Sequence, residues 1–254
     1  MSGVVDPDFA LAAIAARQPI DLPALLLVAH SDDEVLGCSV AMRHLPQLRL
    51  VHATDGSGGD QRVATQRLQE VMAATKELGL TPSMAPCGLP DGALIEHAGA
   101  LASALAAWMP DTALLITHAF EGGHPDHDAC ALAGQLACLQ EFARSGRRVA
   151  RLEFAIYSGW GGAIRTNAFP RDATPAPTVL TLSPEEKMRK HRALQAFASQ
   201  RHVVERFPLD SEAIRPAPDH DFAAPRDPNG LLFAFQNPER EPEWRHAAVA
   251  ALAS

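Results

Sequence analysis

The stretch LLLVAHSDDEVLGC, residues 25–38, passes from apolar residues into one histidine and three acids and then returns to apolar residues. The apolar run over 24–29 predicts a buried β-strand, so the polar residues follow its carboxyl end. Ser31 and Glu34 have the spacing of a capping box, in which the hydroxyl and the carboxylate satisfy free N–H groups at a helix start. This interpretation leaves His30 without a role, so helix capping alone does not explain the cluster.

Short apolar runs alternate with longer amphipathic stretches along the chain, which is typical of βαβ units and a mostly parallel sheet. Strands are expected over 24–29, 48–54, 83–87, 113–117 and 151–157, and helices over 60–79, 127–146 and from 183 onwards. The last helix has a clear start, because Ser183 and Pro184 precede two acids that favour the positive end of the helix dipole.

We therefore expect one α/β domain over residues 1–254, with a core of about 22–200 and a C-terminal arm of about 203–254. Within this arm, the Pro- and Asp-rich residues 207–230 predict irregular structure that covers the core.

The composition argues against several classes of protein. With 47% hydrophobic residues among 254, the chain can bury a substantial core. A net charge of −8 argues against a nucleic-acid partner, since proteins that bind phosphate backbones usually present a basic face. The four cysteines form no CxxC pair, the N-terminus lacks a signal-peptide pattern, and no window approaches the ~18 apolar residues of a membrane span. We expect a cytoplasmic protein with reduced thiols, no membrane segment and no nucleic-acid partner, and the sequence leaves a homo-oligomer open.

Polar residues follow each of the first four predicted strands. They form the segments 30–34, 54–62 (TDGSGGDQR), 88–92 (GLPDG) and 118–129 (HAFEGGHPDHDA). Ligands bind beyond the carboxyl ends of the strands in an open parallel sheet, so these loops should converge on one rim. The fourth loop can be explained as a glycine turn followed by a helix with Asp126 as its N-cap. That explanation leaves His124 and His127 unassigned, and together with His30 they indicate a functional site.

These side chains are suited to zinc chemistry. A catalytic zinc site uses three nitrogen or oxygen ligands and leaves one position for water. His30 and Asp33, three residues apart across a strand-to-helix turn, can face one point, and a histidine from the distant loop can complete the set. Adjacent aspartates cannot point the same way, so Asp32 is expected to accept a proton from the attacking water. His124, held by Asp126, could then protonate a leaving amine or stabilise an oxyanion.

The segments AHSDDEVLG and GGHPDHDA resemble the two signature motifs of the PIG-L/LmbE-like family of zinc-dependent N-deacetylases, AHPDDE and HPDH. The segments TDGSGG and LPDGAL (89–94) and the K…AL…SQ pattern (187–200) also follow the layout of the family. The resemblance covers about residues 22–200. It implies a Rossmann-like three-layer fold, a Zn²⁺ or similar divalent ion, and deacetylation of a small-molecule N-acetylglucosamine-type sugar or its conjugate.

By position, the resemblance implies roles for eight residues. His30, Asp33 and His127 would bind the metal, Asp32 would be the general base, His124 would be the second catalytic group, and Asp126 would orient it. Arg67 and Asp91 match positions near the sugar or its aglycone. Alternatively, Arg67 pairs with Glu70 or Asp60, and Asp91 only forms a turn before a glycine.

The chain departs from the family at two places. Ser31 stands where the family has a proline, although a serine there can cap the turn and is not itself a ligand. Some members have a tyrosine just before HPDH, where this chain has two glycines, and its single tyrosine is Tyr157. Oxyanion stabilisation is therefore expected to fall on the ion and on protonated His124.

Two alternatives of another class stay open. The segment DGSGGDQR could bind a nucleotide or phosphate at a helix N-terminus, although it lacks the lysine of a P-loop and carries two acids. The same fold could also serve a non-catalytic carbohydrate- or metal-binding protein, which an intact Asp32 argues against.

Overall fold

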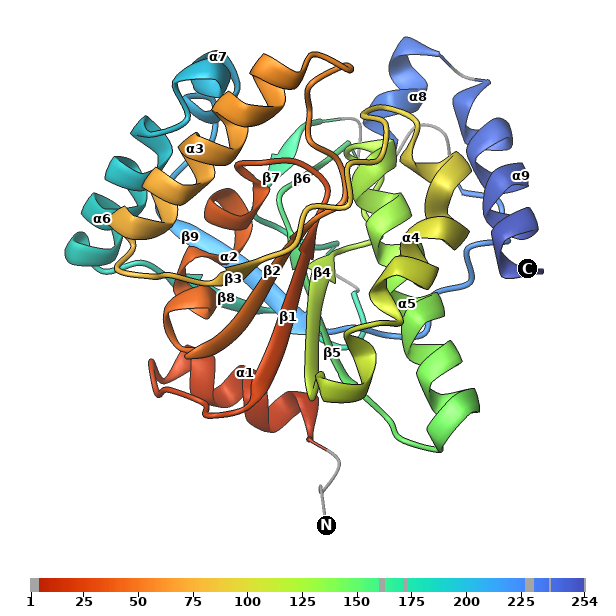
Figure 1. The fold of residues 1–254 in the computed structure, drawn as a ribbon, viewed down its shortest axis with the longest axis horizontal. Helices are drawn as coiled ribbons and strands as arrows, with labels where there is room; N and C mark the ends of the chain where they lie inside the picture. The colour runs from red at the N-terminus through yellow and green to blue at the C-terminus, as the bar shows by residue number, and fades with distance from the viewer. Residues whose placement is uncertain (1–4, 160–162, 171–172, 227–230, 238, 254) are drawn as a thin grey trace.

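A seven-stranded sheet forms the centre of the molecule, in the order β3-β2-β1-β4-β5-β9-β8 (Figure 1). The structure is a computed structural model that describes residues 5–159, 163–170, 173–226, 231–237 and 239–253. The sheet strands are β1 (Pro23–Val28), β2 (Gln47–His52), β3 (Ser83–Met84), β4 (Leu114–His118), β5 (Ala150–Ala155), β8 (Thr178–Thr181) and β9 (Ser211–Pro216). A separate ribbon joins β6 (Tyr157–Ser158) to β7 (Arg165–Thr166). Strands β1 to β5 are parallel, whereas β9 runs antiparallel to β5 and β8, which confirms the predicted mostly parallel sheet.

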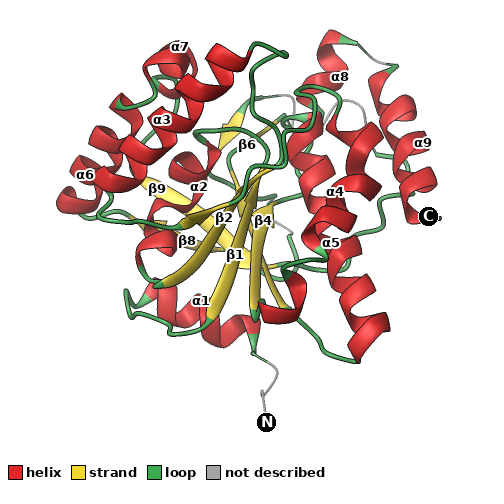
Figure 2. Cartoon of the chain, in the orientation of Figure 1, coloured by secondary structure: helices red, strands yellow, loops and turns green. Residues whose placement is uncertain are grey.

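Helices cover both faces of the sheet and complete the predicted three layers (Figure 2). One layer contains α1 (Pro7–Ala15), α2 (Asp33–Arg43), α3 (Gln61–Glu77) and α6 (Pro184–Gln195), and the other contains α4 (Ala98–Leu105), α5 (Pro125–Ser145) and α9 (Arg240–Leu252). The short helices are α7 (Arg201–Val204), α8 (Leu232–Gln236), η1 (Leu94–His97), η2 (Met109–Asp111) and η4 (Ala198–Gln200). Every helix in the described part of the chain is too short or too polar to span a bilayer.

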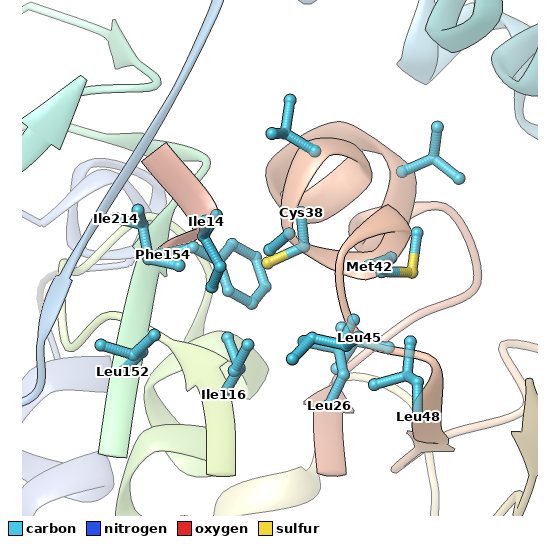
Figure 3. Close-up of a cluster of buried hydrophobic side chains, with 14 of the residues drawn as sticks. Ile14, Leu26, Cys38, Met42, Leu45, Leu48, Ile116, Leu152, Phe154 and Ile214 are labelled. Carbon is cyan, nitrogen blue, oxygen red and sulfur yellow. The ribbon is translucent and has the colours of Figure 1, made fainter. Parts of the chain in front are cut away.

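Alternating side chains along β1 supply both halves of the core. Leu26 and Val28 pack in the cluster under α1 and α2, whereas Leu25 and Leu27 pack in the cluster under α4 and α5. All four are at most 1% exposed, because helices cover both faces of the sheet. Figure 3 shows the first cluster, where Leu26 and Phe154 lie against α2. Burying each such side chain contributes about 1.5–3 kcal/mol, which fixes the strands whose ends form the rim.

The five predicted strands and three predicted helices are all present, with ends shifted by a few residues. Ser183 is the N-cap of α6 and Pro184 is its first residue, as the sequence predicts. The core also begins earlier than residue 22, since Ala10 and Ile14 of α1 are fully buried in it.

The prediction of irregular structure over 207–230 is wrong for Ser211–Pro216, which form β9 inside the sheet. The sequence pattern did not indicate this strand because it contains Glu212, and an acid is seldom fully buried unless it has a partner. Here its carboxylate lies 2.8 Å from Lys190 Nζ, and both side chains are 1% exposed. Residues 227–230 lie outside the described residues, and the single domain over 1–254 stays a prediction.

Candidate active site

The predicted loops converge at the carboxyl ends of the parallel strands, at the end of the sheet opposite the N-terminus (Figure 1). The strand order reverses between β1 and β4, and ligands bind at such a switch point. A cavity of about 240 Å³ opens there, which we call the active-site cavity. Seven of the eight predicted site residues line it: His30, Asp32, Asp33, Arg67, Asp91, His124 and His127. The eighth, Asp126, is fully buried behind His30, so all eight are brought together.

The predicted metal ligands meet at Asp33. Its Oδ2 lies 3.2 Å from His30 Nδ1, and its Oδ1 lies 3.3 Å from His127 Nε2. In a tetrahedral zinc site with bonds of about 2.0–2.1 Å, neighbouring ligand atoms are about 3.3–3.4 Å apart. Burial, followed by the charge of His118, lowers the pKa of His127 to about 4, so this imidazole is neutral, as a metal ligand must be. Asp33 therefore lies at the spacing of a shared metal ion from each of the two histidines.

The charges around His30 and Asp33 reinforce each other. Burial alone would lower the pKa of His30, but hydrogen bonds with Asp126, Asp33 and Asp91 outweigh it and raise this pKa well above its usual value. Burial alone would raise the pKa of Asp33, but His127 and His118 outweigh it and hold this pKa well below its usual value. Without a metal, the carboxylates thus hold His30 in its charged form.

His118 is a site residue that the sequence did not single out. It is fully buried at the end of β4, its Nε2 accepts a hydrogen bond from Ala29 N–H at 3.0 Å, and its ring stacks on His127 with centroids 3.9 Å apart. Among the described residues, three sets of donor atoms lie within 4.8 Å of one another: Asp33, His118 and His127; His30, His124 and His127; and His30, Asp91 and Asp126. Because His118 Nε2 already accepts the Ala29 hydrogen bond, we assign this histidine to holding β1 beside β4. Its only sequence signal is a histidine that ends an apolar strand.

Asp32 has an unusual backbone conformation. Its φ of 124° lies outside the regions that side-chain-bearing residues favour, a strain of about 1–3 kcal/mol that often marks a functional position. The predicted capping box is wrong: Asp32 is the N-cap without a side-chain cap, and Glu34 Oε2 instead accepts the Asp32 N–H at 3.0 Å. Burial, followed by the charges of Asp33 and Glu34, raises the pKa of Asp32 well above its usual value, which suits a proton acceptor.

The backbone N–H of Asp126 holds the His124 side chain, whereas the Asp126 carboxylate contacts the loop at 88–94 and His30. The Asp126 N–H donates to His124 Nδ1 at 3.1 Å, so His124, and not Asp126 as predicted, is the N-cap of α5. This bond places the imidazole proton on Nε2. Burial, followed by the charges of His30 and His127, lowers the pKa of His124 to about 3, so it is a neutral donor.

The Asp126 carboxylate joins the loop at 88–94 to the metal site. It accepts hydrogen bonds from Gly92 N–H at 2.7 Å and Leu94 N–H at 3.0 Å, and its Oδ2 lies 3.4 Å from His30 Nε2. Asp91, on the same loop, lies 3.1 Å from the same nitrogen. Both ring nitrogens of His30 therefore face carboxylates, which fixes the orientation of the ring.

Arg67 points into the site and makes neither of the ion pairs considered from the sequence. Asp60 pairs with Arg62 at 3.0 Å, and Glu70 accepts hydrogen bonds from Ser199. Arg67 is only 8% exposed.

Tyr157 also lines the active-site cavity, which sequence reasoning did not foresee. Its ring stands edge-on to His127, with centroids 5.4 Å apart. Glu121 Oε1 accepts the N–H of Tyr157 at 3.1 Å. A Cβ on Gly123 would lie 1.8 Å from the Tyr157 carbonyl oxygen, so the second glycine before HPDH lets this backbone approach closely. The single tyrosine of the chain thus reaches the site from β6.

The chain is similar to a known protein family and to several solved structures. The model of the PIG-L family, described as GlcNAc-PI de-N-acetylase, matches residues 25–138. Similar structures include a zinc-inhibited form of teicoplanin deacetylase (14% identity, TM-score 0.54, covering 78% of this chain and 100% of that one). They also include the A40926 pseudoaglycone deacetylase (16%, 0.56, covering 78% and 97%) and a conserved protein from Thermus thermophilus (20%, 0.52, covering 79% and 96%). Comparison with curated protein sequences finds no match.

The structural similarities establish a shared fold. The matched residues 25–138 contain all eight predicted site residues and His118, whereas Tyr157 lies outside them. The resemblance of this chain to the PIG-L/LmbE-like family, which its two histidine–aspartate motifs indicate, is confirmed by the family model and by the fold.

Proposed function

We propose that this protein is a metal-dependent deacetylase that hydrolyses the acetamide of an N-acetylglucosamine-type sugar or its conjugate. One observation carries the proposal: Asp33 stands between His30 and His127 in a cavity that Asp32 and His124 also line. The matching family model and the deacetylase names of two similar structures support this class of reaction.

His30, Asp33 and His127 would hold the divalent ion. When bound, such an ion polarises the acetyl carbonyl and lowers the pKa of a water molecule. Two imidazoles and a carboxylate suit zinc. One similar structure is described as zinc-inhibited, so the active ion has to be established by titration.

The remaining residues supply proton transfer and charge stabilisation. Asp32, buried and with its pKa raised, accepts the proton of the attacking water. His124 Nε2–H donates to the developing oxyanion as a neutral imidazole, which replaces the protonated His124 expected from the sequence. Asp32 then returns its proton to the leaving nitrogen, and Tyr157 and Asp91 line the space that the sugar would fill.

Acetate release tests this proposal. Protein stripped of metal is reconstituted with Zn²⁺, Co²⁺ or Mn²⁺ and given a panel of N-acetylglucosamine glycosides. We expect metal-dependent release of acetate, and its loss in Asp33→Ala together with the loss of bound ion. Asp21→Ala removes an exposed aspartate that contacts Gln47 and serves as the matched control. Absence of metal binding, or stabilisation against heat by nucleotides but not by divalent ions, would favour the nucleotide-binding alternative.

A further inference from the structure

The C-terminal arm contacts the loop at 119–124, which joins β4 to α5 and which we call the histidine loop. Helix α9 of the arm packs against α4 and α5 (Figure 1). The Leu232 N–H donates to the Gly122 carbonyl at 2.9 Å, and Trp244 Nε1 donates to the Pro125 carbonyl at 3.1 Å. One bond lies before and the other directly after the histidine that caps α5. The arm therefore holds both sides of a residue that the proposed reaction uses.

A buried ion pair joins the same arm to the first turn of α5. Arg226 Nη2 donates to Asp128 Oδ2 at 2.8 Å, and the Asp128 side chain is fully buried while that of Arg226 is 16% exposed. The other carboxylate oxygen of Asp128 accepts the N–H groups of Glu121 at 3.1 Å and Gly122 at 3.0 Å. One carboxylate therefore connects Arg226 to the backbone of the histidine loop.

Aromatic rings from both segments surround the Arg226 guanidinium. Its central carbon lies 4.0 Å from the ring centroid of Phe120, which belongs to the histidine loop. The rings of Trp244 and Phe233, which belong to the arm, lie 5.1 and 5.6 Å away. The Arg226 N–H also donates to Glu241 Oε1 at 3.3 Å. Cation–π attraction and the ion pair thus fix this side chain between the arm and the loop.

The histidine loop in turn positions two groups of the active-site cavity. It carries His124, and Glu121 Oε1 accepts the N–H groups of Ile156 and Tyr157, each at 3.1 Å. Both His124 and Tyr157 line the cavity. The described residues of the cavity wall do not include Arg226, which therefore acts on these groups only through the histidine loop.

We propose that Arg226 is a positioning residue: through Asp128 it fixes the histidine loop and thereby the His124 imidazole beside the substrate. This inference rests on the proposed function. It adds to that function a segment of the chain outside residues 25–138, which the family model matches. Without Arg226, the buried Asp128 carboxylate loses its counter-charge, and the loop that it holds is no longer tied to the arm.

Arg226→Met tests the proposal, because it removes the guanidinium and keeps an apolar side chain among the rings. We expect kcat for an N-acetylglucosamine glycoside to fall about 10- to 100-fold, the usual cost of a small displacement of a catalytic group. The KM should change by less than about threefold, since His124 stabilises charge that develops only in the transition state. Bound ion should stay at one equivalent per chain, which shows that the protein is folded. Arg226→Lys keeps a positive charge beside Asp128 and should recover part of the kcat.

Arg151→Met is the matched control. The Arg151 side chain is 15% exposed and ties the same arm to β5 through the Pro218 carbonyl at 3.1 Å, away from the histidine loop. This variant should keep kcat within about threefold of the wild-type value, even where its free energy of unfolding falls. An unchanged kcat in Arg226→Met, or equal losses of kcat in the two variants, would overturn the positioning role.

Amide hydrogen exchange separates this proposal from a failure of the proposed function. The N–H groups of Glu121 and Gly122 should exchange at least about tenfold faster in Arg226→Met than in the wild-type protein or in Arg151→Met, whether or not acetate is released. Unchanged exchange would overturn the link between arm and loop, whereas absence of acetate release by the wild-type protein would overturn the proposed function. If Arg226→Met does not fold, Asp128→Asn is added, because it removes the orphaned charge. The double variant should fold and show the same loss of kcat and the same faster exchange.

Discussion

Helix α2, which begins with Asp33, is kinked at Cys38 (φ −134°), and a buried ion pair satisfies the groups that the kink leaves unbonded. Lys190 Nζ donates to the Leu36 carbonyl at 2.7 Å, and Glu212 accepts the N–H groups of the two residues after Cys38, each at 3.0 Å. Because both charged side chains are 1% exposed, removal of one partner leaves a buried charge.

Lys190→Met should therefore destabilise the fold by about 3–5 kcal/mol, the usual cost of breaking a buried pair. At about 2–4 °C per kcal/mol for a chain of this size, the melting temperature should fall by about 6–20 °C. The measurement is urea unfolding followed by circular dichroism, with thermal unfolding beside it. Adding Glu212→Gln to Lys190→Met should recover part of the loss, because the orphaned charge is then removed as well.

Lys187→Met is the matched control, since its side chain is 39% exposed and pairs with the exposed Asp210. This pair should contribute less than about 1 kcal/mol. A loss below about 1 kcal/mol in Lys190→Met, or equal losses in the two variants, would refute the view that the ion pair holds the kinked helix.

Three further predictions concern the site itself. Asp126→Asn should weaken metal affinity about 10- to 100-fold in a chelator-competition titration, because it removes a carboxylate that orients His30; an unchanged affinity would contradict this role. Tyr157→Phe should lower kcat about 3- to 10-fold, because Tyr157 lines the active-site cavity. Urea unfolding should be unchanged, since the hydroxyl donates no hydrogen bond to the described residues. An unchanged kcat would place this hydroxyl away from the transition state. In the metal-free protein, the pKa of His127 is about 4 in the folded state, against an ordinary value of 6.5. The contribution of neutral His127 to folding stability is therefore complete above pH 6.5 and is lost as the pH falls towards 4. That loss is on the order of 3 kcal/mol, and urea midpoints that rise on acidification over this window would contradict it.

Residues at the ends of apolar strands could be placed from the sequence, because a parallel sheet brings those ends to one rim. His30, Asp33, His124 and His127 were found this way. His118 was missed because a single histidine at the end of a buried strand has no local partner in the sequence. The partners that hold it, Ala29 N–H and the ring of His127, come from other segments.

Contacts between distant segments account for the remaining differences. Strand β9 was missed because the partner of its buried Glu212 is Lys190, on a helix about twenty residues earlier. The expected Ser31–Glu34 capping box does not form, since Glu34 bonds to Asp32 N–H and pairs with His52 on β2. Tyr157 could not be assigned, because its place in the cavity depends on how β5 leads into β6 and not on a motif.

The role of Asp32 is the most direct test of the central claim. Bound metal per protein chain and acetate release should be measured together for the wild-type protein and for Asp32→Asn, an isosteric change that removes only the base. We predict that Asp32→Asn keeps one equivalent of metal while kcat falls about 10²- to 10⁴-fold, the usual contribution of a general base. Full acetate release by metal-loaded Asp32→Asn would contradict the account.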